Sequence, residues 1–201
     1  MENKIYIIGC GGHARGVADV ILDNDPTAKL VFVDRNAREM ETIFGFPVIK
    51  SLPATAENVF IALGDNALRQ DLARNQKLIS VISKRAYISP QAHISDGVFI
   101  ADGVHIGPCA NIGKGTIINT NAVVEHEAEI GDFTHISVNS TICGRAKIGS
   151  NVFIGAGATV IDKISVCSNV TIGAGGVVVK NIDISGTYIG IPARILKDNR
   201  K

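Results

Sequence analysis

The chain lacks the features that would direct it to a charged partner, a thiolate metal site or a membrane. Its 201 residues carry a formal net charge of only +1, so there is no electrostatic case for nucleic acid or an anionic bilayer. Its four cysteines form no Cys-x-x-Cys pair, which predicts a reduced, cytoplasmic protein without a thiolate metal site. Its first apolar run, Ile5–Ile8, is far too short for a signal peptide or a membrane span.

A six-residue repeat fills the second half of the chain. From Ile88 to Ile184, every sixth residue is Ile or Val without a break. The residue four after each of these anchors is usually small, and the residue three after is Gly or Asn in ten units. Because Gly and Asn tolerate positive φ, this position is expected to be a corner of the chain.

Such a unit is typical of the hexapeptide repeat of a parallel β-helix. No single unit can bury its own anchor, so coils of three units must stack at the strand spacing of about 4.8 Å and cover one another. We therefore predict that residues 85–201 form a β-helix that ends in a short tail.

Residues 1–84 have a different pattern. Apolar runs bounded by turn residues predict strands at residues 4–8, 30–34, 59–63 and 78–82. Apolar residues at helical spacing predict helices at residues 14–23 and 67–76. Strands that alternate with helices indicate a small parallel α/β domain of the Rossmann type over residues 1–84.

A glycine-rich turn follows the first predicted strand. The segment Gly9-x-Gly11-x-x-Ala14 matches a dinucleotide-type fingerprint, in which bare backbone and a helix N-terminus receive a diphosphate. Asp34 ends the next strand, where a ribose hydroxyl would be held. The alternative is a tight turn that needs glycine for its geometry alone.

Two more residues are expected near this turn. Gly64 ends a neighbouring strand and would face the same crevice. His13 lies at the mouth of the turn, where it would either donate to a phosphate or a sugar, or cap the helix.

Exceptions to the repeat gather in its third coil. Glu127 and Phe133 replace the expected Gly or Asn at two neighbouring corners. His126 precedes Glu127 on an outward corner, while His135 and Asn119 lie in adjacent units. A histidine beside carboxylates is a candidate general base, because an acidic neighbour strengthens the imidazole as a base and fixes its tautomer. The alternative is that both histidines are ordinary surface residues.

The order of these parts resembles the bacterial sugar acetyltransferases of the NeuD/PglD type. The segments that carry the resemblance are Gly9–His13, Ile118–Glu127, Ile130–His135, Ile154–Gly157 and Gly190–Arg194. The resemblance implies a left-handed β-helix, acetyl-CoA as co-substrate, and a homotrimer with active sites between neighbouring prisms.

The resemblance also implies a role for individual residues. His126 would be the catalytic base and Glu127 would increase its basicity. Asn119 and His135 would line the site, and His135 would also meet acetyl-CoA. The backbone around Ala156 and Ala174 would contact the pantetheine arm. The nucleotide-sugar would be held by Gly11, Gly12, His13, Asp34 and Gly64, and by Arg35, which stands where relatives can carry an aspartate.

The predicted function is N-acetylation of the 4-amino group of a UDP- or GDP-linked 4-amino-4,6-dideoxy-sugar in bacterial surface-glycan biosynthesis. The acetyl group would pass directly from acetyl-CoA, with His126 as base. The close alternative is O-acetylation of a sialic or other nonulosonic acid, although the complete glycine turn with His13 and Asp34 favours the nucleotide-linked amine.

Two other classes of protein are alternatives. One is a non-catalytic oligomer whose α/β domain binds a nucleotide. The other is a zinc enzyme resembling the γ-type carbonic anhydrases, which present a close His-x4-His pair, and this sequence contains no such pair. No metal is therefore expected.

Overall fold

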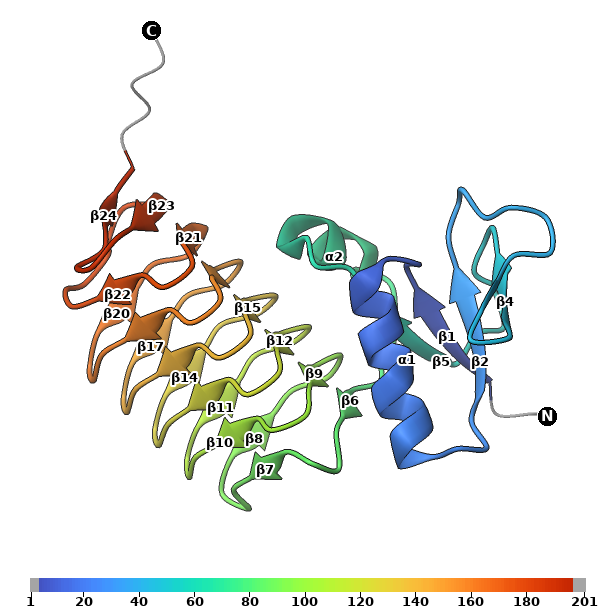
Figure 1. The fold of residues 1–201 in the computed structure, drawn as a ribbon, viewed down its shortest axis with the longest axis horizontal. Helices are drawn as coiled ribbons and strands as arrows, with labels where there is room; N and C mark the ends of the chain where they lie inside the picture. The colour runs from blue at the N-terminus through green and yellow to red at the C-terminus, as the bar shows by residue number, and fades with distance from the viewer. Residues whose placement is uncertain (1–3, 197–201) are drawn as a thin grey trace, which may run out of the picture.

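The computed structural model describes residues 4–196 and consists of an α/β domain followed by a solenoid of short strands (Figure 1). The solenoid extends away from the α/β domain, and β23 and β24 lie at its far end. The elements of the α/β domain are β1 (Lys4–Ile8), α1 (Gly12–Asn24), β2 (Lys29–Val33), β3 (Thr42–Ile43), β4 (Phe46–Ile49), β5 (Asn58–Ile61) and α2 (Asn66–Leu72).

The sheet of the α/β domain has the order β3-β4-β2-β1-β5. β1 is parallel to both β2 and β5, so the chain reverses its direction of winding next to β1. α1 buries Ala14, Val17, Ala18 and Ile21, whose spacing places them on one face of the helix. The predicted helix at residues 14–23 is confirmed, and the second predicted helix is shorter than expected, at Asn66–Leu72.

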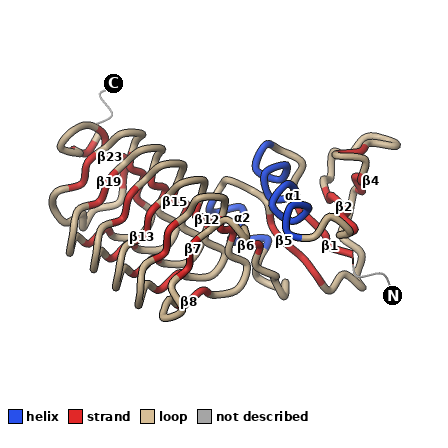
Figure 2. The backbone as a smooth tube through the Cα atoms, turned by 60° about the horizontal axis from the view of Figure 1, so that its bottom comes forward, coloured by secondary structure: helices blue, strands red, loops and turns tan. Residues whose placement is uncertain are grey.

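The solenoid has three faces, which we number in the order the chain visits them (Figure 2). The first face contains β6 (Val81–Ile82), β9 (Phe99–Ile100), β12 (Ile117–Ile118), β15 (His135–Ile136), β18 (Phe153–Ile154), β21 (Val170–Ile172), β23 (Gly186–Ile189) and β24 (Arg194–Ile195). The second face contains β7 (Tyr87–Ile88), β10 (His105–Ile106), β13 (Val123–Val124), β16 (Thr141–Ile142), β19 (Thr159–Val160) and β22 (Val177–Val178). The third face contains β8 (His93–Ile94), β11 (Asn111–Ile112), β14 (Glu129–Ile130), β17 (Lys147–Ile148) and β20 (Ser165–Val166).

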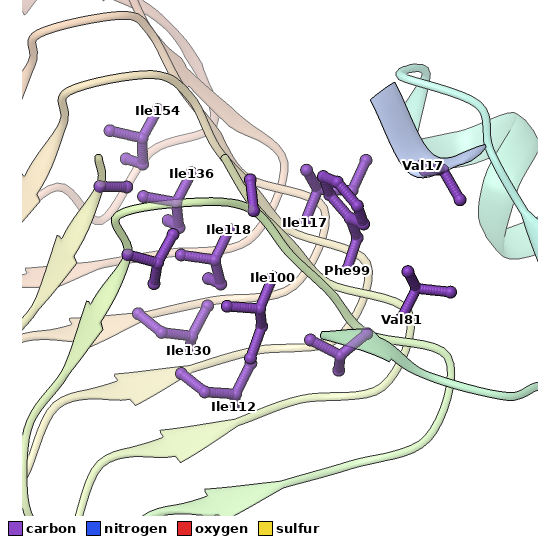
Figure 3. Close-up of a cluster of buried hydrophobic side chains, with 14 of the residues drawn as sticks. Val17, Val81, Phe99, Ile100, Ile112, Ile117, Ile118, Ile130, Ile136 and Ile154 are labelled. Carbon is purple, nitrogen blue, oxygen red and sulfur yellow. The ribbon is translucent and has the colours of Figure 1, made fainter. Parts of the chain in front are cut away.

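The anchors from Ile88 to Val178 stack on anchors one coil away, whereas the last predicted anchor, Ile184, is 67% exposed because the final coil bridges Val166 to Ile182 instead. Ile118 pairs in parallel register with Ile100 below it and with Ile136 above it. These anchors are fully buried, and Figure 3 shows them in one column inside the prism. The predicted fold class, a Rossmann-like α/β domain followed by a parallel β-helix of hexapeptide repeats, is confirmed.

The corner positions adopt positive φ almost throughout the solenoid. Nine of the ten predicted Gly and Asn corners do so, and Asn181 is not among them. Five other residues are held in the same conformation, namely Cys109, Glu127, Phe133, Arg145 and Lys163. Since a side chain in this conformation costs roughly 1–2 kcal/mol, the stacking of the coils must impose it.

The last strand predicted for the α/β domain belongs to the solenoid instead. Residues 78–82 were expected to be the fourth strand of the α/β domain, but only Val81 and Ile82 form a strand, and they pair with Phe99 and Ile100 of the solenoid. Leu78 keeps a single bridge to Val59 of β5. Apolar residues in this register continue the first face of the solenoid, which explains the difference. The boundary between residues 84 and 85 remains a prediction.

The two described helices contain 13 and 7 residues. Within residues 4–196, therefore, no helix has the length and apolar character needed to cross a bilayer.

Candidate functional site

The glycine turn lies at the carboxyl end of β1, next to the point where the winding of the sheet reverses. Gly9 has a φ of +116°, and a Cβ there would lie 2.8 Å from the carbonyl oxygen of Ala62. α1 begins at Gly12, and a Cβ built on Gly11 or Gly12 would meet nothing within 4 Å. The start of the helix is therefore open to a ligand, and crevices of this type are the usual ligand sites of parallel sheets.

The other residues expected at the crevice surround this turn. Gly64 follows β5, which pairs with β1, so both strands end at the same edge of the sheet. Asp34 follows β2, and its carboxylate accepts the backbone N–H of Asn36 at 2.8 Å. The pKa of the Cys10 thiol in the turn is raised, mainly by burial and secondly by the nearby charge of Asp34. Arg35 is exposed beside Asp34.

A cavity of about 390 Å³ separates α1 from the solenoid. Four of the predicted site residues line it, namely Gly12, His13, Asn119 and His135. The Nδ2 of Asn119 lies 3.5 Å from Nε2 of His135. The structure thus brings together residues from the glycine turn and from the third coil, which are more than a hundred positions apart in the sequence.

The two histidines of the cavity are held in their neutral form. Burial lowers the pKa of His13 to about 4, and the nearby His135 and Arg69 act in the same direction. Burial likewise lowers the pKa of His135 to about 4, with Arg69 as the second cause, although a backbone hydrogen bond with Gly64 opposes this. Neutral imidazoles can both donate and accept hydrogen bonds, which suits a sugar or phosphate ligand.

His13 does not cap its helix. The N-cap of α1 is Gly11, and within residues 4–196 no side chain makes a capping hydrogen bond there. The His13 ring instead meets Phe99 edge to face, with 5.1 Å between ring centroids, and its buried Nε2 has no hydrogen-bond partner within residues 4–196. The capping alternative is therefore wrong, and the ring has a nitrogen free for a ligand in the cavity.

His126 and Glu127 form a pair on the corner between β13 and β14. Nδ1 of His126 lies 3.0 Å from Oε2 of Glu127, and Nε of Arg145 lies 3.1 Å from the same oxygen. The hydrogen bond with His126, and to a smaller degree the charge of Arg145, lower the pKa of the Glu127 carboxyl. Because an ionised carboxylate can only accept, Nδ1 carries the proton, and in the neutral imidazole the lone pair is then on Nε2.

Two residues beside His126 were not found from the sequence. A Cβ built on Gly144 would lie 2.6 Å from Cε1 and Nε2 of His126, so only glycine leaves room for this imidazole. The same position lies 3.0 Å from Oδ1 of Asp162, one coil further on. Gly144 occupies the same corner position as His126, eighteen residues later, and this stacking of unlike residues was the available signal.

Phe133, one of the exceptions to the repeat, joins the solenoid to the α/β domain. Its ring is 6% exposed and belongs to a core cluster with Val59, Ile61, Ala73 and Leu78 of the α/β domain. An aromatic residue in left-handed backbone conformation is strained, so this docking contact helps to retain it.

The predicted site residues of the solenoid lie on two different edges of the prism. Asn119 follows β12 and lies on the edge between the first and second faces. Ala156 and Ala174 lie on this same edge, two and three coils beyond residue 120, and Gly175 donates its N–H to the carbonyl of Ala156 at 2.8 Å. His126 and Glu127 lie on the edge between the second and third faces.

A larger, open hollow of about 710 Å³ lies along the third face. It is lined by outward residues of that face such as Asn111 and Glu129, and it contains none of the predicted site residues. The smaller cavity beside α1 is therefore the better candidate for a substrate site. Among residues 4–196, no three His, Cys, Asp or Glu side chains gather closely enough to hold a metal ion.

Comparisons with known proteins agree with this architecture. Residues 4–76 match the family model described as the PglD N-terminal domain. The acetyltransferase domain of PglB from Neisseria gonorrhoeae FA1090 is 32% identical, with a TM-score of 0.89 over 96% of this chain and 100% of that chain. PerB from Caulobacter crescentus, solved in complex with CoA and GDP-perosamine, is 34% identical, with a TM-score of 0.86 over 96% of this chain and 97% of that chain.

A curated viral protein shares only part of the chain. An uncharacterised protein of Acanthamoeba polyphaga mimivirus is 37% identical over 93 residues, which is 43% of this chain. The match spans 19% of the length of the viral protein.

The chain combines a β-helix of hexapeptide repeats with an α/β domain docked on its first face, and its similarity to the PglB and PerB structures over nearly its whole length places it in the class of hexapeptide-repeat acyltransferases. Within that class, the chain belongs to the family of bacterial sugar N-acetyltransferases of the NeuD/PglD type. The family predicted from the sequence is confirmed.

Proposed function

We propose that the protein transfers the acetyl group of acetyl-CoA to the 4-amino group of a UDP- or GDP-linked 4-amino-4,6-dideoxy-sugar in bacterial surface-glycan biosynthesis. Relatives that are about a third identical over nearly their full length support the co-substrate and the acceptor. One of these structures contains acetyl coenzyme A, and others contain CoA with GDP-perosamine.

The proposed mechanism rests on the finding that the predicted site residues of the solenoid lie on two different edges of the prism. The cavity with His13, Asn119 and His135 opens at the edge between the first and second faces, whereas His126 lies across the second face at its other edge. One chain therefore does not bring its own His126 to its own cavity. A second copy, packed through its second face, would supply the missing histidine, which supports a homotrimer with sites between subunits.

The second face is suited to this contact. Within residues 4–196, the outward residues of its six strands include no Asp, Glu, Lys or Arg and are Tyr87, His105, Val123, Thr141, Thr159 and Val177, although Glu125 follows directly after β13. The third face, by contrast, carries the ion pair of Lys147 with Glu129, 2.9 Å apart. A face without charged side chains can be buried between subunits without the desolvation of ions.

In the proposed reaction, the amine attacks the thioester carbonyl carbon, and His126 removes the proton that the nitrogen loses. Glu127 keeps one proton on Nδ1 of His126, so Nε2 is the ring nitrogen that accepts the proton of the amine. The tetrahedral intermediate then expels the CoA thiolate, and the acetyl group remains on nitrogen as an amide. Holding acceptor and thioester together at the subunit boundary supplies the proximity effect.

The residues of the cavity and crevice would bind the two substrates. The nucleotide would lie on Gly11, Gly12, Asp34, Arg35 and Gly64, and the sugar would lie against His13, Asn119 and His135. The pantetheine arm would follow the edge that carries Ala156 and Ala174 and so end beside the cavity. His135 would meet both substrates.

The test is to offer acetyl-CoA with UDP- and GDP-linked 4-amino-sugars, and with free or CMP-linked nonulosonic acids. Mass spectrometry then follows the gain of one acetyl group. The proposal expects acetylation of a nucleotide-linked amine. Acetylation of the nonulosonic acids alone would instead support the O-acetyltransferase alternative, and binding of nucleotide without transfer to any acceptor would support a non-catalytic oligomer.

A further inference from the structure

Arg69, in α2, is buried at the junction between the α/β domain and the solenoid. Its relative exposure is 1%. Burial lowers the pKa of its guanidinium to about 10, so the side chain remains charged at neutral pH. A buried charge is tolerated only when its donors are satisfied, and the partners of a buried arginine therefore show what it holds in place.

The guanidinium binds both parts of the molecule at once. On the α/β side, Nη1 donates to the carbonyl of Leu63 and Nη2 to Oδ1 of Asn66, both at 2.8 Å. On the solenoid side, the acceptors are the carbonyls of Gly115 at 2.8 Å, Phe133 at 2.9 Å and Thr134 at 3.4 Å. Because the guanidinium is planar, these bonds fix the orientation of the two parts as well as their distance.

The residues it holds are neighbours of the substrate site. Leu63 precedes Gly64, which lies at the crevice of the α/β domain. Thr134 precedes His135, which lines the cavity. Together with the packing of Phe133, Arg69 thus sets the position of the nucleotide crevice relative to the sugar cavity.

We propose that Arg69 is a positioning residue. It holds the α/β domain at the distance and angle from the solenoid at which a nucleotide bound to the α/β domain places the sugar amine correctly. This inference rests on the proposed function, because it requires the nucleotide to be held by the α/β domain while the sugar lies against the solenoid. Misplacement of a reacting group by about 1 Å can cost on the order of a hundredfold in rate. Without the guanidinium, a bound nucleotide no longer places the amine correctly, so the nucleotide no longer increases kcat/KM.

The test compares Arg69→Met and Arg69→Lys with the wild type on two acceptors. One is a nucleotide-linked 4-amino-sugar, and the other is the methyl glycoside of the same 4-amino-sugar. We expect kcat/KM for the nucleotide-linked acceptor to fall on the order of a hundredfold, and kcat/KM for the methyl glycoside to fall by no more than about tenfold, because His13 is its one proposed contact on the α/β side. Lysine should restore little, because it cannot reproduce the planar set of bonds.

Arg74→Met is the matched control. Arg74 lies just beyond α2, its side chain is 74% exposed, and its ion pair with Asp71 spans 3.3 Å at the surface. We expect this variant to match the wild type on both acceptors, because exposed ion pairs contribute little.

Equal losses on the two acceptors would overturn the proposal, since a merely structural defect affects both alike. The ratio of the two kcat/KM values does not depend on the fraction of folded protein, so partial unfolding of Arg69→Met leaves the comparison valid. If the wild type acetylates neither acceptor, the proposed function fails instead.

Discussion

Oε2 of Glu127 lies 3.0 Å from Nδ1 of His126, and the same oxygen lies 3.1 Å from Nε of Arg145. The carboxylate therefore orients the imidazole and is itself held by a cation. In the neutral imidazole this arrangement places the lone pair on Nε2 of His126, and the proposed chemistry depends on that nitrogen.

Glu127→Gln should lower kcat by at least about tenfold, because an amide can donate to Nδ1 and so stabilise the wrong tautomer. The affinity for acetyl-CoA, measured by calorimetry, should stay close to that of the wild type. Glu129→Gln is the control, since Glu129 pairs with Lys147 on the third face and does not contact His126. A Glu127 variant with wild-type kcat would show that the carboxylate does not orient the base.

His126→Ala should lower kcat by roughly a hundredfold to ten-thousandfold, which is the usual contribution of a general base. Its affinity for acetyl-CoA should be nearly unchanged, because the imidazole acts on the attacking amine. Steady-state kinetics and calorimetry measure the two quantities. His93→Ala, on the exposed start of the third face, serves as the control. Near-normal turnover in His126→Ala would remove this residue from the base role.

Gly144→Ala should lower kcat nearly as much as His126→Ala, because the new methyl group would lie 2.6 Å from the imidazole and displace it. The double variant tests this explanation. Once the imidazole is absent, the added methyl group should cause no further loss, so the two effects should be strongly non-additive. Additive losses would mean that Gly144 acts independently of His126.

The stability of the protein should fall as the pH falls from about 6.5 to about 4. The pKa of His13 and that of His135 are each lowered to about 4 in the folded protein. The unfolded chain, with ordinary imidazoles, therefore binds more protons in this range. For each histidine, the free energy of unfolding decreases by at most about 1.4 kcal/mol for each pH unit within this range. Above about pH 6.5 the two histidines cause no further change in stability.

Urea unfolding at several pH values measures this dependence. The His13→Gln/His135→Gln double variant should unfold with a flatter pH profile than the wild type between about pH 4 and 6.5. His93→Gln should keep the wild-type slope. Equal slopes for the double variant and the wild type would contradict the neutral, buried state of the pair.

The solenoid could be predicted from the sequence because its information is local. Each Ile or Val anchor repeats at the same interval, and most corners carry Gly or Asn, which tolerate positive φ. The α/β domain was predicted less well at its end: Val81 and Ile82 look like any short buried strand, and only pairing with Phe99 and Ile100 assigns them to the solenoid.

The site was predicted only in part because it depends on contacts between distant segments. His126 and Glu127 are adjacent in sequence, so their pairing was visible. The approach of His13 to His135 depends on the angle at which the α/β domain docks, which Arg69 and Phe133 determine. Arg69 lies in the helix predicted at residues 67–76, and no pattern in the sequence marks its burial.

The most direct test of an active site between subunits is activity in mixed oligomers. His126→Ala retains the cavity, and His13→Ala/Asn119→Ala retains the base, so each variant alone should be nearly inactive. Co-expression with different tags allows oligomers that contain both chains to be isolated. If each site combines the cavity of one subunit with His126 of another, each trimer that contains both chains has one intact site out of three, so the isolated mixed trimers should show about one third of wild-type activity. Mixed oligomers as inactive as their parents would contradict the account.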